Sequence, residues 1–274
     1  MSSLELTPPI FSILSGLIEE TFGLHYGSSE RELLRDKVAA RAEQAGFQSL
    51  LDYYYFLRYD PAGTAELTEL AEHLVVNETY FFREWRSIEV LVDSFLAPWC
   101  AEGRRPRIWS AACATGEEPL SLAMLLAERG LLDKVEIVAT DISARVLSKP
   151  KAGLYGKRSV RQLPQRHLVD RFLSREEDAY RVSPELVQAI RWKNVNLMID
   201  AEVAALGVFD VILCRNVLIY FSDATVRAVL GRLATALRDD GVLLVGVSES
   251  LMRYGNGFFG EEHGGSFVYR KAER

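Results

Sequence analysis

The chain has 274 residues, of which 49% are hydrophobic and 26% are charged. A chain of this size buries a large core without a disulfide or a metal, which excludes the collagen-like, disordered and mini-protein classes and fits one large or two modest domains. The formal net charge of −6 argues against a general nucleic-acid binder, because such proteins gain most of their affinity by neutralising phosphates.

The first 90 residues follow helical periodicity throughout. Five segments share this pattern, and they are the residues after Pro8-Pro9 and the stretches 29–45, 49–60, 67–74 and 85–95. The turn-forming residues Glu102–Pro106 follow them. We therefore expect an all-helical domain over residues 1–90, followed by a linker over residues 91–106.

From residue 107 the pattern changes to short apolar runs that alternate with helical segments. The runs that predict buried strands are residues 107–113, 135–140, 209–214, 242–247 and 267–270. Continuous apolar strands separated by helices indicate a parallel sheet covered on both faces. A turn at Gly264-Gly265 is expected to return the last strand antiparallel at an edge. We expect this second domain to span residues 107–274, with a small antiparallel β insertion within about 175–197.

Small and acidic residues follow the predicted strands, at the positions where open parallel sheets bind ligands. The segment Ala111–Pro119 follows the first strand, Asp141 the second and Arg215-Asn216 the third. Acids at the first two strand ends suit a ligand with hydroxyl groups and positive charge, and S-adenosylmethionine carries a ribose diol, an ammonium and a sulfonium. Glu118 is expected to face an amine or to help hold the nucleoside. Asp141 either accepts hydrogen bonds from a ribose or caps the helix that follows it.

Motifs of other ligand classes are absent from the sequence. It contains no dinucleotide-binding GxGxxG, no phosphate-binding GxxxxGK[ST] and no zinc-binding HExxH. The four histidines show no metal-ligand spacing and the three cysteines form no CxxC, so we expect no metal site. Because we find no secretion signal and no apolar run long enough to span a bilayer, we expect a cytoplasmic protein that does not insert into membranes.

Three longer strings carry a resemblance to a known family. They are NETYFFRE at Asn77–Glu84, WSAACATGEEP at Trp109–Pro119 and FDVILCRNVLIYF at Phe209–Phe221. These strings resemble the signatures of the chemotaxis protein methyltransferases, the CheR family, and the resemblance covers nearly the whole chain. It implies an α/β fold in which an N-terminal all-helical domain precedes a Rossmann-like S-adenosylmethionine-dependent methyltransferase domain. It also implies methyl transfer from S-adenosyl-L-methionine to glutamate side chains of chemoreceptors, which leaves S-adenosyl-L-homocysteine.

The resemblance implies roles for individual residues of this chain. The residues implied to bind the cofactor are Asn77, Thr79, Arg83, Glu118, Asp141, Asn196, Leu197, Cys214 and Arg215. The residues implied to act in catalysis are Arg83, Arg215 and Tyr220. Tyr220 matches the tyrosine near the transferred methyl, where it either donates its hydroxyl or only packs. Asn194 offers a second asparagine that can be aligned in place of Asn196.

A glutamate acceptor makes modest chemical demands on the protein. Its carboxylate has an unperturbed pKa of about 4.3 and is already ionised at neutral pH, so no general base is needed. A dry site favours the reaction because a carboxylate and a sulfonium both lose their charge, and alignment of the reacting atoms adds to the rate. We expect Arg83 to position the carboxylate or the cofactor without taking part chemically. The alternative is that Arg83 only pairs with Glu78 or Glu84.

The second predicted helix carries basic residues that suit docking to acidic receptor helices: Arg31, Arg35, Lys37 and Arg41. Leu34 and Val38 fall between the two basic pairs on a helical wheel, so a solvated face beside a core seam is the alternative. The expected partner is the cytoplasmic helical region of a chemoreceptor, and residues 151–200 have room for a subdomain that binds the receptor's C-terminal peptide. No nucleic-acid partner is expected. Nothing in the sequence demands an oligomer, so we expect a monomer.

Two other functions compete with receptor methylation in chemotaxis. In the first, the same fold and cofactor act on a receptor of a non-motility pathway or on another carboxylate acceptor. In the second, the chain is a non-catalytic module that docks on a receptor and senses the cofactor. The joint presence of Arg83, Asp141, Arg215 and Tyr220 argues against this last function.

Overall fold

Two compact units make up the chain. The computed structural model describes residues 4–162, 165–254 and 257–272. The first unit comprises the chain up to Val76 together with Tyr220–Val226, and the second comprises Asn77–Ile219 and the chain from Arg227 onward. Among the described residues, no helix combines the length and the apolar character that a membrane span needs.

The first unit is helical, in accordance with its apolar periodicity. It contains α1 (Pro8–Phe22), the 3-10 helix η1 (Ser28–Glu30), α2 (Arg31–Gln44), α3 (Leu50–Tyr59) and α4 (Gly63–Leu74). Gly23 ends α1 in the left-handed conformation, and the Ser49 hydroxyl caps α3 by accepting a hydrogen bond from the Asp52 amide at 3.3 Å. The helices bury apolar side chains that include Leu14, Ile18, Leu34, Val38 and Leu70.

A segment from far along the chain completes this unit. Phe221 pairs with Leu24 in an isolated antiparallel bridge, and the His25 amide donates to the Tyr220 carbonyl at 2.9 Å. The Glu19 carboxylate in turn contacts the His25 ring at 2.9 Å. Backbone pairing therefore assigns Tyr220–Val226 to the helical unit, although the sequence places this segment between a strand and a helix of the second unit.

The residues after position 90 are helical rather than a linker. α5 (Trp85–Leu91) continues through the π-helical turn η2 (Val92–Leu96) into α6 (Ala97–Ala101). Pro98 follows the π-helical turn, and the helix continues past it to Ala101, so this proline does not end the helix. This differs from the linker expected over residues 91–106. The boundary between the units also precedes the expected residue 90, because α5 belongs to the core of the second unit.

A seven-stranded sheet forms the centre of the second unit, in the order β6-β2-β1-β7-β8-β10-β9. Its strands are β1 (Arg107–Ala111), β2 (Glu136–Asp141), β6 (Ile190–Asn194), β7 (Phe209–Cys214), β8 (Leu237–Val245), β9 (Phe258–His263) and β10 (Ser266–Lys271). The first five strands in this order are parallel, whereas β10 is antiparallel to β8 and to β9. The expected antiparallel return of the last strand is confirmed, but β10 lies between β8 and β9, so β9 rather than β10 is the edge strand.

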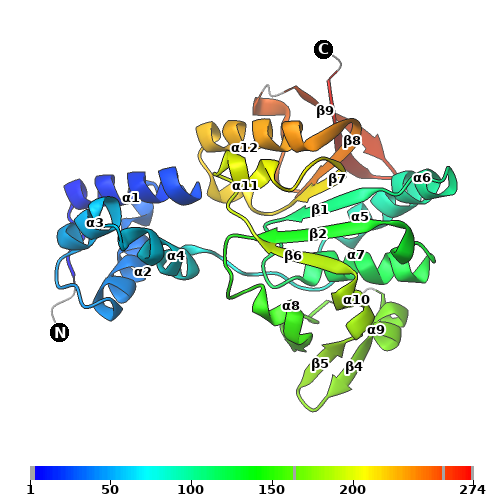
Figure 1. Cartoon of the computed structure of the whole chain (residues 1–274), viewed down its shortest axis with the longest axis horizontal. Coiled ribbons are helices and arrows are strands. Elements are labelled where there is room, and N and C mark those ends of the chain that lie inside the picture. The colour runs from blue at the N-terminus through cyan, green and yellow to red at the C-terminus, as the bar shows by residue number, and fades with distance from the viewer. Residues whose placement is uncertain (1–3, 163–164, 255–256, 273–274) are drawn as a thin grey trace. The chain divides into compact units, whose positions relative to one another are not determined.

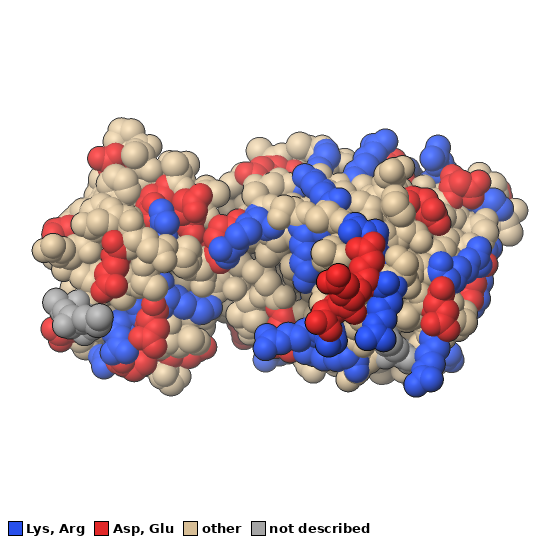
Figure 2. All heavy atoms as spheres, turned by 90° about the horizontal axis from the view of Figure 1, so that it is seen from below, with Lys and Arg blue, Asp and Glu red and all other residues tan. Residues whose placement is uncertain are grey.

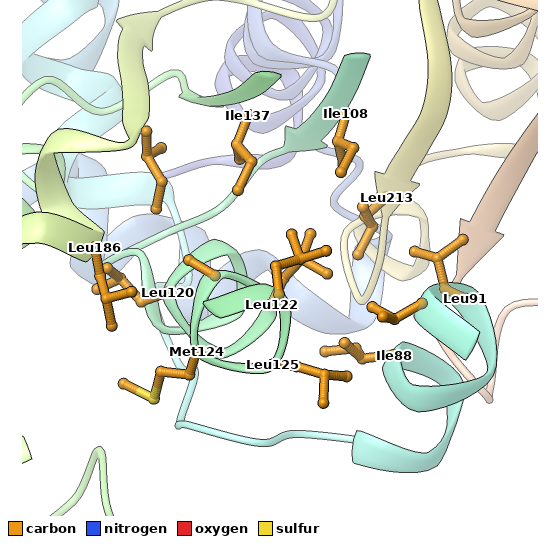
Figure 3. Close-up of a cluster of buried hydrophobic side chains, with 14 of the residues drawn as sticks. Ile88, Leu91, Ile108, Leu120, Leu122, Met124, Leu125, Ile137, Leu186 and Leu213 are labelled. Atoms are coloured by element: carbon orange, nitrogen blue, oxygen red, sulfur yellow. The ribbon is translucent and has the colours of Figure 1, made fainter. Parts of the chain in front are cut away.

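Helices cover both faces of this sheet (Figure 1). α7 (Glu117–Glu128) and α10 (Pro184–Gln188) lie on one face, and α11 (Asp200–Ala204) and α12 (Asp223–Ala236) lie on the other. Short 3-10 turns occur at η3 (Leu132–Lys134), η4 (Leu218–Tyr220) and η5 (Met252–Tyr254). Figure 3 shows strand residues such as Ile108 and Leu213 directed toward Leu122 of α7 and Leu91 of α5. Each such side chain contributes about 1.5–3 kcal/mol by burial, which fixes the strands that carry the site.

A small antiparallel sheet is inserted between β2 and β6. It has the order β3-β5-β4, with β3 (Leu154–Gly156), β4 (Leu173–Glu176) and β5 (Ala179–Val182), and α8 (Ser148–Ala152) and α9 (Arg166–Phe172) accompany it. The insertion was expected within about residues 175–197, but β6 belongs to the main sheet and runs parallel to β2. The reason is α10, because a helical crossover is what returns a chain to a parallel strand.

Candidate functional site

The carboxyl ends of four parallel strands meet at one edge of the sheet. Ala111 at the end of β1 pairs with Thr140 of β2 and with Cys214 of β7, and Asp141 pairs with Asn194 of β6. The predicted residues that end these strands or leave them are Glu118, Asp141, Asn196, Leu197, Cys214 and Arg215. The register of the sheet thus gathers residues that are far apart in the sequence.

Asp141 joins two loops through its carboxylate. One oxygen accepts a hydrogen bond from the Ala114 amide at 2.8 Å, and the other accepts one from the Ser143 amide at 2.9 Å. The residue is 6% exposed. The bond to Ser143 is a turn contact rather than the expected helix cap, since the next helix, α8, begins only at Ser148. A role in holding ribose hydroxyls stays a prediction.

The loop between β1 and α7 has an unusual backbone. Ala112 and Ala114 have φ angles of 56° and 48°, and Gly116 has a φ of 87°. This left-handed region disfavours side chains, so small residues are the ones that fit. A Cβ atom on Gly116 would lie 2.9 Å from the Pro150 side chain and 2.9 Å from the Trp192 ring. Such conformations cluster at ligand sites, where surrounding contacts hold them in place.

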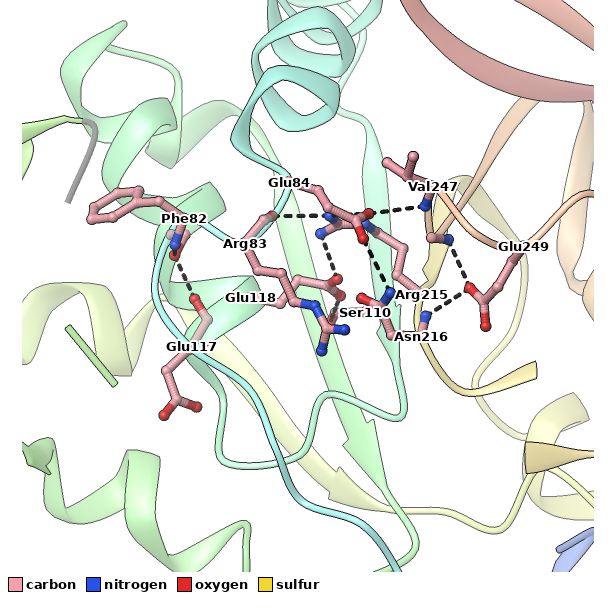
Figure 4. Close-up of polar contacts among 12 residues, drawn as sticks. Phe82, Arg83, Glu84, Ser110, Glu117, Glu118, Arg215, Asn216, Val247 and Glu249 are labelled. Carbon is pink, nitrogen blue, oxygen red and sulfur yellow. Dashed lines mark hydrogen bonds and ion pairs between the residues drawn. The ribbon is translucent and has the colours of Figure 1, made fainter. Parts of the chain in front are cut away.

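Arg215 is the centre of a buried cluster of charges (Figure 4). Its side chain is 1% exposed, and its guanidinium lies 2.9 Å from the carboxylate of Glu84 and 2.9 Å from that of Glu118. Nη2 also donates to the Arg83 carbonyl at 2.9 Å. Ser110 donates to the second oxygen of Glu118 at 2.6 Å. Two protein carboxylates therefore occupy the Arg215 head group, and its expected parts in cofactor binding and catalysis stay predictions.

Glu249 joins the ends of β7 and β8. Its carboxylate accepts hydrogen bonds from the amides of Asn216 at 2.6 Å, Gly246 at 2.7 Å and Ile219 at 3.3 Å. Burial raises the pKa of Glu249 above its ordinary value, although these amides oppose the rise. Glu249 was not among the site residues predicted from the sequence. The available signal was an acidic residue shortly after the predicted strand over residues 242–247.

Arg83 lies in the segment Asn77–Glu84, which leads into α5. Its Nη1 donates to the Glu78 carbonyl at 3.2 Å, and no carboxylate in the described part of the chain pairs with it. The Glu78 carboxylate pairs instead with Arg161 at 2.9 Å. The alternative in which Arg83 only pairs with Glu78 or Glu84 is thus not seen as an ion pair among the described residues, although Arg83 does contact the Glu78 backbone. A role of its guanidinium in receiving an anionic group stays a prediction.

Asn194 ends β6, beside the end of β2, and Asn196 follows two residues later. The two asparagines have different contacts. Asn194 donates to the carbonyls of Asp141 at 2.9 Å and Ile142 at 2.7 Å, so its amide fastens β6 to β2. Asn196 lies further along and accepts a hydrogen bond from the Met198 amide at 2.9 Å. A role of Asn196 in binding a ligand stays a prediction.

The other implied cofactor residues differ in exposure. Asn77 and Thr79 are half-buried in the segment before Arg83, whereas Leu197 and Cys214 are buried. Burial holds the pKa of the Cys214 thiol well above its ordinary value, so this thiol is neutral at physiological pH. Tyr220 is half-buried within the helical unit, and its proposed place near the methyl group stays a prediction.

The basic residues of α2 fall into two pairs. Nε of Arg41 donates to the Glu66 carboxylate at 2.7 Å, and Lys37 donates to a backbone carbonyl at the end of α4 at 2.6 Å. These contacts hold α2 against α4 and give Lys37 and Arg41 a structural role. The side chains of Arg31 and Arg35 are 40% and 36% exposed. The expected part of all four residues in docking stays a prediction.

Figure 2 shows how charge is distributed on one face of the molecule. Lysine and arginine side chains are interspersed with aspartate and glutamate over the visible surface of each unit. The alternative of a solvated face beside a core seam on α2 stays open beside the docking prediction. Arg31 pairs with Glu32 at 3.7 Å, and Arg35 pairs with Glu32 and Asp36 of the same helix.

The strand edge has the donor and acceptor chemistry that S-adenosylmethionine requires. The carboxylates of Glu118 and Asp141 suit its ammonium and its ribose hydroxyls, and the adjacent loop is built from alanines. Nε of Arg215 is buried and has no hydrogen-bond partner among the described residues, so an acceptor from a bound molecule or a water would satisfy it. In the described ranges no group of three or more potential metal ligands is found.

Known proteins that resemble this chain share its two-part organisation. The family model described as "CheR methyltransferase, SAM binding domain" matches residues 77–262, and "CheR methyltransferase, all-alpha domain" matches residues 10–75. The chain is 36% identical to chemotaxis protein methyltransferase 2 of Vibrio cholerae, over 92% of this chain and 89% of that protein.

Two further relatives agree with this match. The identity is 34% with chemotaxis protein methyltransferase 1 of Pseudomonas aeruginosa, over 88% of this chain and 90% of that protein. It is 31% with the chemotaxis protein methyltransferase of Borreliella burgdorferi, over 91% of this chain and 90% of that protein. The sequence resemblance, the α/β fold and the cofactor assignment are confirmed, and the chain belongs to the CheR family of S-adenosylmethionine-dependent methyltransferases of chemotaxis.

Proposed function

We propose that this chain transfers the methyl group of S-adenosylmethionine to glutamate carboxylates of chemoreceptors and so forms methyl esters. The observation that carries the proposal is the contrast between two arginines at one site. Arg215 is paired with two carboxylates, whereas Arg83 is paired with none among the described residues. A guanidinium in this state suits an incoming carboxylate, which it can hold through two parallel hydrogen bonds.

The protein's part in this reaction is placement rather than proton transfer. A glutamate carboxylate is ionised at neutral pH, so the attacking oxygen needs no base. Burial also keeps the pKa of the Cys113 and Cys214 thiols well above their ordinary values, so neither thiol competes as a nucleophile. Bound S-adenosylmethionine supplies an electrophilic methyl group. Asp141 and Glu118 would hold its ribose and its amine, and Arg83 would orient the acceptor carboxylate.

The test is transfer of a tritiated methyl group to the purified cytoplasmic region of a chemoreceptor. The wild-type protein is expected to leave label that base releases, as a methyl ester does. We expect Arg83→Ala to lower kcat/KM about a hundredfold, because a misplaced acceptor loses the alignment on which the rate depends. Arg191→Ala is the control, because Arg191 is an exposed arginine that pairs with Glu136. Label that resists base, or a folded Arg83→Ala protein with near wild-type transfer, would contradict the proposal.

The chemistry of the surface agrees with a receptor partner. Arg31 and Arg35 are available to acidic receptor helices, and the small sheet β3-β5-β4 is our candidate for binding a receptor C-terminal peptide. We infer that the protein acts on the cytoplasmic region of the receptor, in the cytoplasm and as a monomer. Titration with the receptor tail peptide tests the proposed binding to the small sheet, and sedimentation of the free protein tests the monomeric state.

A further inference from the structure

We propose that Glu84 is a positioning residue that sets the place of Arg83, an inference that rests on the proposed function of Arg83. Glu84 directly follows Arg83 and stands at the entrance of α5. Its side chain is 19% exposed and points toward the ends of β7 and β8 (Figure 4). The sequence suggested Glu84 only as an ion-pair partner of Arg83, whereas its partners in the structure are Arg215, Asn216 and the Val247 amide.

Both oxygens of the Glu84 carboxylate are engaged by groups distant in the sequence. Oε2 accepts hydrogen bonds from Nη2 of Arg215 at 2.9 Å and from the Val247 amide at 3.1 Å. Oε1 accepts one from Nδ2 of Asn216 at 3.1 Å. One side chain therefore ties the segment that carries Arg83 to the ends of two core strands.

The backbone on both sides of Arg83 depends on such ties. Phe82 has a φ of 63° and Glu84 has a φ of 49°, so two left-handed residues flank Arg83. Conformations of this kind cost about 1–3 kcal/mol each and persist only where neighbouring contacts hold them. The Phe82 amide donates to the Ser121 hydroxyl at 3.0 Å on one side, and the Glu84 carboxylate provides the contacts on the other side.

The charge of Glu84 matters as well as its shape. Burial would raise the pKa of Glu84, but Arg215, Asn216 and the Val247 amide together hold it below its ordinary value. The carboxylate is therefore ionised at neutral pH and accepts from three donors. A glutamine at this position would place its own NH2 group against one of them. We expect the left-handed backbone at Phe82 and Glu84 to change conformation, and Arg83 to move from the position in which it orients the acceptor.

A double-mutant cycle tests whether Glu84 acts through Arg83. We expect Glu84→Gln to lower kcat for receptor methylation by at least about tenfold, because small displacements of an orienting group are costly. In an Arg83→Ala background the same change is expected to lower kcat by less than about twofold, since coupled residues are not additive. Glu128→Gln is the control, because Glu128 is 23% exposed, pairs with Arg129 and lies at the far end of α7.

The outcomes separate this inference from the proposed function. Absence of methyl transfer by the wild-type protein would overturn the proposed function itself. If wild-type transfer is present, an unchanged kcat for Glu84→Gln, or an equal loss in both backgrounds, would overturn the positioning role. If Glu84→Gln does not fold, Asn216→Gly takes its place: it removes one donor to Glu84, and glycine tolerates the φ of 58° at that position. The same dependence on Arg83 is then expected.

Discussion

Left-handed backbone at non-glycine residues is concentrated in three loops of the second unit. Apart from Glu177 in the turn between β4 and β5, the described residues with this conformation are Phe82, Glu84, Ala112, Ala114 and Asn216. Buried carboxylates meet this set directly: Asp141 accepts from the Ala114 amide, and Glu249 from the Asn216 amide. Backbone strain and buried acids therefore coincide at the strand edge, which is typical of a preorganised binding site.

A comparison of two glycine substitutions can separate two contributions to stability at Gly116, the left-handed backbone and the close packing of the β1–α7 loop. Gly116→Ala places a Cβ 2.9 Å from the Pro150 side chain and the Trp192 ring, at a φ of 87°. Gly130→Ala imposes a similar φ of 66° with no heavy atom within 4 Å of the new Cβ. We expect urea unfolding to show a loss of about 1 kcal/mol for Gly130→Ala and at least about 1 kcal/mol more for Gly116→Ala. Equal losses would show that the loop has room to adjust.

The sequence pointed to candidate site residues that come soon after predicted strands. It did not point to Glu84 and Glu249, whose contacts depend on how the strands of the sheet align. Asp141 directly follows the predicted strand over residues 135–140, and Glu118 lies in the segment Ala111–Pro119 after the first strand. Their expected place at the sheet edge follows from the rule for parallel sheets. Glu84 and Glu249 meet Asn216 only once β7 and β8 are aligned and α5 has turned toward them. No local pattern encodes such contacts, because the partners are distant in the sequence.

Helix α2 combines a structural task with a surface that is free for a partner. Arg41 and Tyr53 both donate to the Glu66 carboxylate at 2.7 Å, which burial would otherwise destabilise. The side chain of Glu66 is 10% exposed, and its pKa lies below the ordinary value because the effect of burial is outweighed by Arg41 and Tyr53. The Arg41 charge is therefore part of the helical core.

We therefore expect substitutions of two arginines of α2 to differ in their effect on the free energy of unfolding. Arg41→Ala leaves the Glu66 carboxylate without its cation, so we expect a loss of about 2 kcal/mol or more in urea unfolding of the protein. Arg35→Ala removes only exposed ion pairs with Glu32 and Asp36 and should cost less than about 0.5 kcal/mol. A loss for Arg35→Ala that matches the loss for Arg41→Ala would contradict the assignment of Arg41 to the core.

The bounds of helices and strands could be predicted where the apolar pattern is regular. The prediction was wrong for β6, which follows the short helix α10. The strand over residues 209–214 was predicted with its observed ends, because all six residues are apolar or buried. β6 has exposed polar residues such as Arg191 and Lys193, so its pattern resembles an antiparallel hairpin strand. Its parallel pairing with β2 follows from α10, a helix of five residues that gives little periodic signal.

At the scale of the whole molecule, the division into units does not follow the order of the sequence. Tyr220–Val226 belongs to the helical unit, through the bridge of Phe221 to Leu24, although the chain on either side belongs to the second unit. A single isolated bridge has no sequence signature. The two-domain composition of the chain was predictable from the change of pattern at residue 107, whereas this return to the first unit was not.

The net charge of −6 affects association with an acidic receptor. The molecule as a whole repels such a partner, whereas the local pair Arg31 and Arg35 attracts it. We expect the double charge reversal of Arg31→Glu and Arg35→Glu to slow receptor methylation about tenfold at low salt, and to make the rate less dependent on ionic strength. The matched control reverses Arg191 and Arg238, which are 69% and 54% exposed, and changes the net charge by the same amount. Initial rates measured across a series of salt concentrations give both the methylation rate and its dependence on ionic strength. Equal slowing by the two double variants would assign the effect to overall charge, and an unchanged rate and salt slope would show that Arg31 and Arg35 do not guide docking.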